Sequence, residues 1–393
     1  MTSLCPGIPI PNRRPIGTYL LLMLWLFVGY VVCLRIAAGL AWSSAVWQGA
    51  LCFLSTGPLL VGVILVIAGP KKLARLSRTL YRAITPLLGL SQYILPWLGW
   101  SVLIWWMNRP AFPWSDALGA GAVIAGFSYA SGLALVIVLR PRAEDVALTE
   151  IEVAIEGLPK AFEGYRIMHL SDIHEGSRLS RAPAGERLER ASGLSADLIV
   201  FTGDLARRAE ALDRGGAALA ALSSSDGIVA VLGNHDHWLG AKRVVDVLSR
   251  VGVRVLTNEN ECIERNGERL YIVGVEDASY VGRDDLPAAL DGIPEKATAI
   301  IATHSPDLAL KPLSGRASLI LAGHTHGGQM VFPWVGPLYV PTRLGRRRMS
   351  GLIEVDERLL YINRGLGEVF PPMRLNCPPE IALITLRSNA DFV

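Results

Sequence analysis

The residues with the clearest capacity for chemistry are Gly233-Asn234-His235-Asp236, which follow the apolar run 227–232. A short β-branched run that stops at a glycine is typical of a buried strand ending in a tight loop. Such a loop presents an amide, an imidazole and a carboxylate at one strand end, and the amide oxygen and imidazole nitrogen are neutral ligands for a divalent cation. One loop supplies too few ligands, so we expect others elsewhere in the chain.

Four more expected strand ends stop in residues of the same types. They carry Asp172 with His174, Asp204, His304, and His324 with His326. Any one of these pairs alone is weak evidence, because such residues also occur as surface or structural pairs. Five in a row, each after an apolar run, predict a metal site at one sheet edge.

From about residue 144 the sequence alternates between short strand patterns and helical patterns. The predicted strands are Glu150–Ile155, Arg166–Leu170, Leu198–Phe201, Ile228–Leu232, Leu270–Val273, Thr298–Ala302, Leu319–Leu321, Leu360–Ile362 and Ile381–Leu386. The predicted helices are Gly185–Ser192, Ala209–Leu222 and Ala241–Val251. This alternation predicts a layered α/β domain over residues 144–393 with central β-sheets.

The first part of the chain has a different composition. Residues 1–143 hold one of the 35 acidic residues and eleven of the 38 basic ones, and the whole chain is 51% hydrophobic. Four apolar runs, at about 17–38, 45–68, 87–107 and 117–139, each approach the ~20 residues that a helix needs to cross a bilayer. We therefore expect a four-helix transmembrane domain over residues 1–143.

The connections between these runs predict an orientation. Nine basic residues lie on one side of the expected helices and two on the other, so the positive-inside rule places both chain ends in the cytoplasm. We expect a multi-pass protein of the inner membrane, with the lipid bilayer as a partner and the second domain in the cytoplasm. That domain is acidic, which argues against nucleic acid as a partner. The five cysteines lack ligand-like spacing and are interpreted as free thiols.

The order Asp-x-His, Gly-Asp, Gly-Asn-His-Asp, His and Gly-His-x-His resembles the calcineurin-like metallophosphoesterase superfamily over residues 165–330. The Gly-Gly-Gln after the last histidine and the tail 363–380 are similar to a bacterial membrane-associated branch that includes hydrolases of UDP-2,3-diacylglucosamine. The resemblance implies a four-layer αββα sandwich. It also implies two divalent metal ions, one held by Asp172, His174 and His326 and the other by Asn234, His304 and His324, with Asp204 as the bridge.

The chemistry of such a centre is consistent with these residue types. Two cations about 3.5–4 Å apart need a bridging carboxylate and can lower the pKa of a water molecule that then attacks phosphorus. His235 follows ligand Asn234 but is assigned to neither metal, so we predict that it protonates the leaving oxygen as a general acid. A nitrogen and oxygen ligand set without cysteine suits Mn, Fe, Zn or Co.

Other polar residues near these motifs are candidates for substrate contact. His237 is expected either to line the substrate entrance or to be a solvated loop residue. Arg364 and Arg374 are candidates for binding a phosphate with two parallel hydrogen bonds. Asp236 is interpreted as a partner that orients a ligand imidazole.

The sequence thus predicts a membrane-anchored phosphoesterase that hydrolyses a phosphate ester or pyrophosphate. The resemblance makes a lipid-linked substrate such as UDP-2,3-diacylglucosamine the leading candidate. Two alternatives stay open: an enzyme acting on soluble nucleotides or phosphoproteins, and a membrane sensor that binds a phosphorylated ligand without turnover. The sequence leaves the substrate, the metal and the oligomeric state open.

Overall fold

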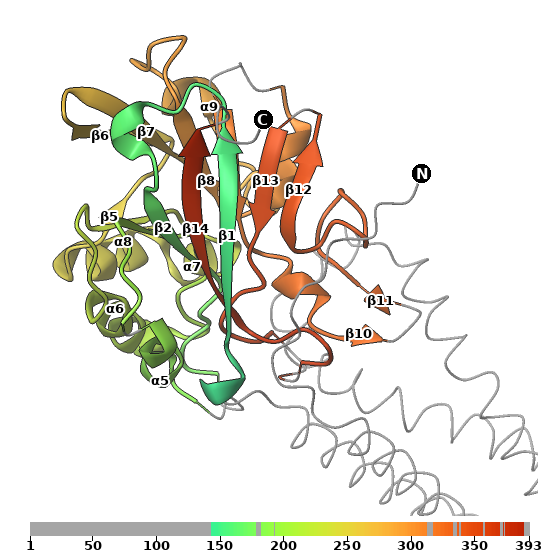
Figure 1. Ribbon diagram of the computed structural model, residues 1–393. Coiled ribbons are helices and arrows are strands. Elements are labelled where there is room, and N and C mark those ends of the chain that lie inside the picture. Colours follow the sequence, from blue (N-terminus) through green and yellow to red (C-terminus); the bar gives the residue numbers. More distant parts are fainter. Residues whose placement is uncertain are drawn as a thin grey trace, which may run out of the picture. The chain divides into compact units, whose positions relative to one another are not determined.

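Two six-stranded β-sheets form the centre of the part of the chain that can be described (Figure 1). The computed structural model describes residues 143–388 apart from 178–181, 192, 313–316, 333–335, 338, 357, 370–371 and 373. The four expected membrane-crossing runs lie outside these residues. Among the described helices, none has the length and apolar character needed to cross a membrane.

The first sheet has the strand order β1-β14-β2-β3-β4-β5. Its strands are β1 (Ala147–Ile155), β14 (Glu380–Ser388), β2 (Arg166–Leu170), β3 (Leu198–Phe201), β4 (Ile228–Ala230) and β5 (Arg254–Val255). Neighbours run parallel except β14 and β2, which are antiparallel. Figure 1 shows β14, from the end of the chain, lying beside β1. The parallel run β2-β3-β4 places the carboxyl ends of three strands at one edge.

The second sheet has the strand order β12-β13-β9-β8-β7-β6. Its strands are β12 (Gly351–Val355), β13 (Arg358–Ile362), β9 (Ala317–Ala322), β8 (Ala299–Thr303), β7 (Glu268–Val275) and β6 (Glu259–Arg265). The four central strands are parallel, and the two outer strands are antiparallel to their neighbours. A separate two-stranded hairpin pairs β10 (Val331–Phe332) with β11 (Gly336–Pro337).

One apolar core lies between the two sheets. Leu198 and Val200 of β3 pack in one buried cluster with Ile300 of β8 and Leu321 of β9. Because successive strand residues point to opposite faces, the residues between them face the other way. The two sheets are therefore packed face to face over a shared layer of aliphatic side chains.

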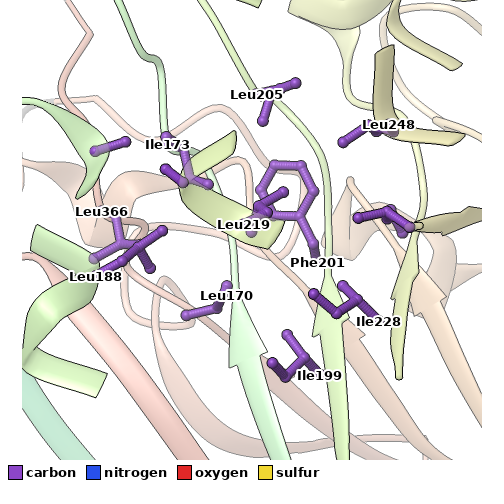
Figure 2. Close-up of a cluster of buried hydrophobic side chains, with 14 of the residues drawn as sticks. Leu170, Ile173, Leu188, Ile199, Phe201, Leu205, Leu219, Ile228, Leu248 and Leu366 are labelled. Atoms are coloured by element: carbon purple, nitrogen blue, oxygen red, sulfur yellow. The ribbon is translucent and has the colours of Figure 1, made fainter. Parts of the chain in front are cut away.

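Helices cover the outer face of the first sheet. They are α5 (Ala184–Leu188), α6 (Leu212–Ala220) and α8 (Ala241–Arg250). Figure 2 shows Ile199 and Phe201 of β3 in one cluster with Leu219 of α6 and Leu248 of α8. Alternate side chains of β3 thus point toward the second sheet and toward the helices.

The outer face of the second sheet is covered by α9 (Leu286–Ala289) and the 3-10 turn Pro306–Leu310, which share a third buried cluster with β7 and β8. The layer order is therefore helix, sheet, sheet, helix, and the predicted α/β sandwich is confirmed. The described residues all belong to one compact unit, Leu139–Val393.

The predicted elements agree with the structure most closely where apolar runs are short and uninterrupted. The bounds of β2 and β3 match their predictions, and α8 ends one residue before its predicted end. Strands β5, β6, β10, β11 and β12 and helices α7 (Asn234–Leu239) and α9 were missed. Among the described cysteines, Cys262 and Cys377 are free, as expected.

We expect Leu321→Ala to lower the free energy of unfolding by about 2–5 kcal/mol, because it deletes a fully buried side chain and leaves a cavity between the sheets. Chemical denaturation of the purified protein would measure the change. Leu352→Ala is the matched control, since Leu352 is 41% exposed, and it should change stability little. Equal losses in both variants would contradict the assigned core.

Candidate metal centre

The seven predicted ligand residues follow strand ends of both sheets and gather at one place. They are Asp172 and His174 after β2, Asp204 after β3, Asn234 after β4, His304 after β8, and His324 and His326 after β9. All seven are at most 7% exposed. Polar side chains this deeply buried must find partners among themselves or bind an ion.

One half of the cluster joins Asp172, His174 and His326. His174 Nε2 lies 3.1 Å from His326 Nε2, and Asp172 Oδ1 lies 3.3 Å from the same atom of His326. The other carboxylate oxygen, Asp172 Oδ2, accepts hydrogen bonds from the His324 backbone and from Ser171 Oγ. The protein thus fixes one oxygen of Asp172 and directs the other toward two imidazole nitrogens.

The other half is centred on His304. Its Nε2 lies 3.1 Å from Asn234 Oδ1 and 2.9 Å from His324 Nδ1. Its Nδ1 lies 2.7 Å from the carbonyl oxygen of Thr202. Because that carbonyl can only accept, Nδ1 carries a proton, and Nε2 is the ring nitrogen that would face a bound cation.

Asp204 lies between the two halves. Its Oδ2 is 3.5 Å from His174 Nε2 and 3.4 Å from His304 Nε2. Its Oδ1 accepts a hydrogen bond of 2.8 Å from the backbone N–H of His235. The position is the one that a bridging carboxylate would occupy.

The donor set fits a divalent cation. Asp172 Oδ1 is buried without a hydrogen-bond partner among the described atoms, and several nitrogen and oxygen lone pairs converge within hydrogen-bond distance of one another. Groups of three, such as Asp172 with His174 and His326, or Asp172 with Asp204 and His304, bring one ligand atom each to within 4.8 Å of the others. Nitrogen and oxygen ligands without sulfur suit Mn, Fe, Zn or Co.

The electrostatics of the cluster show strong attraction between its members. Burial raises the pKa of Asp204 well above its usual value, although the charge of His304 opposes this. Burial lowers the pKa of His304, but Asp204, Asp172 and Asp277 outweigh it and raise that pKa to about 9. Burial also raises the pKa of Asp172, but neighbouring histidines, His326 first, outweigh it and lower that pKa well below normal. A divalent cation can take the place of protons held in this way.

The loops reach the cluster through unusual backbone conformations. Of the ten described non-glycine residues with positive φ, five are predicted ligands: Asp172, His174, Asp204, His324 and His326. Such conformations cost about 1–3 kcal/mol each and collect at functional sites. Gly233 also lets the loops approach each other, because it has no side chain: a Cβ there would overlap Asp204 Oδ1.

Asp236 holds two of these loops together. Its carboxylate accepts hydrogen bonds from the backbone N–H groups of Gly233, Asp204 and Leu205 at 2.7–3.0 Å. The sequence-based interpretation gave it an imidazole as partner, and that partner was wrong. Asp236 positions the ligand Asp204 through the main chain.

His235 lies at the edge of the cluster. Its ring centroid is 4.7 Å from that of His174, and a ring nitrogen of His235 is within 4.8 Å of ligand atoms of His174 and Asp204. Burial, helped by the positive charge of Arg207, lowers the pKa of His235 well below its usual value. A negatively charged phosphoester bound beside it would oppose that shift and favour the protonated ring.

His237 lies in the same short helix, α7, but has another partner. Its side chain is 8% exposed and its Nε2 lies 3.4 Å from Glu276 Oε1. The predicted role at the substrate entrance therefore stays a prediction.

Arg364 and Arg374 have partners within the protein. Arg364 is buried and forms an ion pair of 2.9 Å with Glu380. Arg374 is buried too, and donates to the carbonyl oxygens of Arg364, Gly365 and Gly367. Its Nη2 also lies 3.4 Å from His326 Nδ1. Arg374 thus holds the backbone of residues 364–367 beside the centre. The predicted substrate contact of both arginines stays a prediction.

Sequence reasoning missed two aromatic side chains beside the centre. The ring centroid of Trp238 lies 4.5 Å from that of His235, and the centroid of Tyr280 lies 5.0 Å from that of His324. The proximity of Trp238 could have been inferred, since it is three residues from His235 and three-residue spacing aligns side chains on a helix. Tyr280 lies far from any ligand in sequence, so no local pattern marked it.

Comparison with known proteins agrees with this geometry. The family model for calcineurin-like phosphoesterases matches residues 165–328, which include all seven candidate ligands. The metallophosphoesterase YkuE of Bacillus subtilis is 30% identical over 278 residues, which cover 70% of this chain and 94% of YkuE. The chain therefore belongs to the calcineurin-like metallophosphoesterases, and it is a metal-dependent phosphoesterase.

Two further relatives differ in how much of their length is matched. The phosphodiesterase YaeI of Escherichia coli is 27% identical over 56% of this chain and 82% of its own length. The transmembrane protein with metallophosphoesterase domain of Danio rerio is 28% identical over 62% of this chain, and the match spans 58% of the fish protein.

We expect Gly233→Ala to weaken metal binding about 10–100-fold, the range typical when the support of a ligand is disturbed, because the new methyl group would displace the Asp204 carboxylate. Metal content per chain, measured by elemental analysis after dialysis, would report the loss. Gly185→Ala is the control: a Cβ at Gly185 meets no atom within 4 Å and its φ is not positive. Unchanged metal content in Gly233→Ala would contradict the placement of Asp204 as a ligand.

Proposed function

We propose that this chain hydrolyses phosphodiester or pyrophosphate bonds with two divalent cations, held on one side by Asp172, His174 and His326 and on the other by Asn234, His304 and His324. Asp204 would bridge them. The observation that carries the proposal is the position of Asp204 Oδ2 at 3.4–3.5 Å from one histidine of each half. The name of the phosphodiesterase YaeI supports the diester as the substrate class.

Different residues of the chain would have different roles in such a reaction. Cations bound at this centre would lower the pKa of water and neutralise charge on the phosphoryl oxygens. Asp236 keeps Asp204 in place through the backbone, and Arg374 keeps His326 in place. His235, at the edge of the cluster, would give a proton to the ester oxygen that leaves.

The substrate class we propose is lipid-linked. Support comes from the four apolar runs and basic excess of residues 1–143, and from relatives named transmembrane proteins. A hydrolase joined to a bilayer gains most when its substrate is held in the same bilayer, because the effective concentration of the substrate is then high. UDP-2,3-diacylglucosamine is the specific candidate, with the enzyme in the inner membrane and its catalytic domain in the cytoplasm.

The full chain, purified in detergent and loaded with Mn²⁺, should cleave bis(p-nitrophenyl) phosphate, and should cleave UDP-2,3-diacylglucosamine in mixed micelles with higher kcat/KM than a soluble nucleotide diester. Release of p-nitrophenolate and of the nucleoside monophosphate would be measured. Cleavage of only soluble esters would overturn the lipid-linked substrate and favour a soluble nucleotide or phosphoprotein. Cleavage of none would overturn phosphodiester hydrolysis.

His235→Ala should lower kcat for bis(p-nitrophenyl) phosphate by about 10²–10⁴-fold, the usual contribution of a general acid, while metal content stays near that of the wild type. His237→Ala is the matched histidine in the same helix and should lose less activity. Loss of metal from His235→Ala would instead make His235 a ligand, which its distance to His174 and Asp204 also permits. Unchanged turnover would exclude it from the reaction and would favour a centre that does not use a protonated side chain.

A further inference from the structure

The exposed aromatic side chains of the described residues are concentrated at the metal centre. Trp238, Tyr280 and Tyr339 are 50%, 47% and 60% exposed, and the other exposed large hydrophobic side chains in this part of the chain are leucines. Trp238 and Tyr280 contact rings of the cluster, and Tyr339 Oη lies 3.3 Å from Tyr280 Oη. Exposed aromatic area gathered at one site is typical of a binding surface.

The two aromatic side chains contact different halves of the centre. Trp238 contacts His235, whose ring contacts His174 in the first half of the cluster. Tyr280 contacts His324, whose Nδ1 is 2.9 Å from His304 Nε2 in the other half. Asp204 Oδ2 separates these halves. A phosphorus atom held between the two halves would therefore have one aromatic ring near each half.

The backbone that carries each ring is fixed, although the rings are exposed. The carboxylate of buried Asp277 accepts hydrogen bonds from the backbone N–H groups of Ser279, Tyr280 and Val281, which fixes the turn carrying the tyrosine. Trp238 belongs to α7, whose first turn is fixed by the Asp236 hydrogen bond to Gly233. Rings positioned in advance lose little freedom when a ligand binds.

We propose that Trp238 and Tyr280 are the walls of two subsites that receive the two organic substituents of a phosphodiester, and that planar or apolar substituents bind best. The proposal rests on the proposed function and narrows its substrate class. Trp238 contacts the proposed general acid, so its subsite receives the leaving group. Tyr280 then contacts the substituent that stays on phosphorus.

Two phosphodiesters that share a leaving group can distinguish the two subsites experimentally. Phenyl p-nitrophenyl phosphate and methyl p-nitrophenyl phosphate both release p-nitrophenolate and differ only in the substituent that stays. The Mn²⁺-loaded wild type should prefer the phenyl ester about tenfold in kcat/KM, since contact between two aromatic rings adds to the gain from the buried area. Tyr280→Ala should remove this preference, and Tyr280→Phe should restore it. Trp238→Ala should raise KM for both esters by a similar factor, and Trp238→Phe should recover most of the loss.

A binding measurement tests the same subsites without turnover. Diphenylphosphinate and dimethylphosphinate have no ester bond to cleave, and calorimetry should give tighter binding of the diphenyl compound to the wild type. Each alanine variant should lose part of that difference. Leu352→Ala, which removes an exposed side chain from β12, is the control for general surface changes and should behave as the wild type. Metal content and circular dichroism verify that each variant is folded and loaded.

The outcomes separate the two proposals. Equal kcat/KM for the phenyl and methyl esters in the wild type, or unchanged discrimination in Tyr280→Ala, would overturn the aromatic subsites while leaving phosphodiester hydrolysis standing. Equal binding of the two phosphinates would overturn the subsites as well. Failure of the wild type to cleave any diester would overturn the proposed function, and the phosphinate measurement would still decide whether the rings bind the substituents.

Discussion

The position of one carboxylate, that of Asp204, determines whether the two halves of this centre can act together. Strand β3 pairs in parallel with β2 on one side and β4 on the other, so the residues that follow these three strands emerge side by side. The hydrogen bond from His235 N to Oδ1 fixes the rotation of the carboxylate and leaves Oδ2 between His174 and His304. The second sheet is tied to the same point by the contact of His304 Nδ1 with Thr202 O, directly after β3.

The sequence-based predictions agree best with the structure where a ligand-type residue directly follows the end of a strand. Parallel strands buried on both faces appear as short, continuous apolar runs, and a ligand-type residue after each run marks the same sheet edge. This is why β2, β3 and the gathering of the seven candidate ligand residues at one place could be predicted. Strand β6 (Glu259–Arg265) was missed because it pairs only with β7, and an edge strand can carry many charges. Helix α7 was missed because it begins at the ligand Asn234, where the polar sequence resembles a loop.

The two arginines of the tail show a different limit of sequence reasoning. In sequence, Arg364 and Arg374 lie among glycines and prolines, where a guanidinium group is usually solvated and can also bind a phosphate. In the fold, the backbone of Gly367 bonds to the metal loop at Asp172, and the carbonyl oxygens of Arg364, Gly365 and Gly367 accept hydrogen bonds from Arg374. One guanidinium offers five N–H groups in a plane, so Arg374 can serve several carbonyls at once, which a lysine could not do as well. The need for a hydrogen-bond donor to these carbonyl oxygens arises only from the tertiary structure.

The strained backbone of the ligand loops explains why so much of the surrounding chain is polar and buried. Five ligands with positive φ together carry a cost comparable to the stability of an entire domain, so the loops alone could not maintain it. Hydrogen bonds to their main chain restrain them: Asp236 binds the N–H of Asp204, and Asp172 Oδ2 binds the N–H of His324. The second of these bonds joins a loop of one sheet to a loop of the other. Each sheet therefore holds the ligands of its partner in place, and the face-to-face packing of two separate sheets is a condition of the site as well as of the fold.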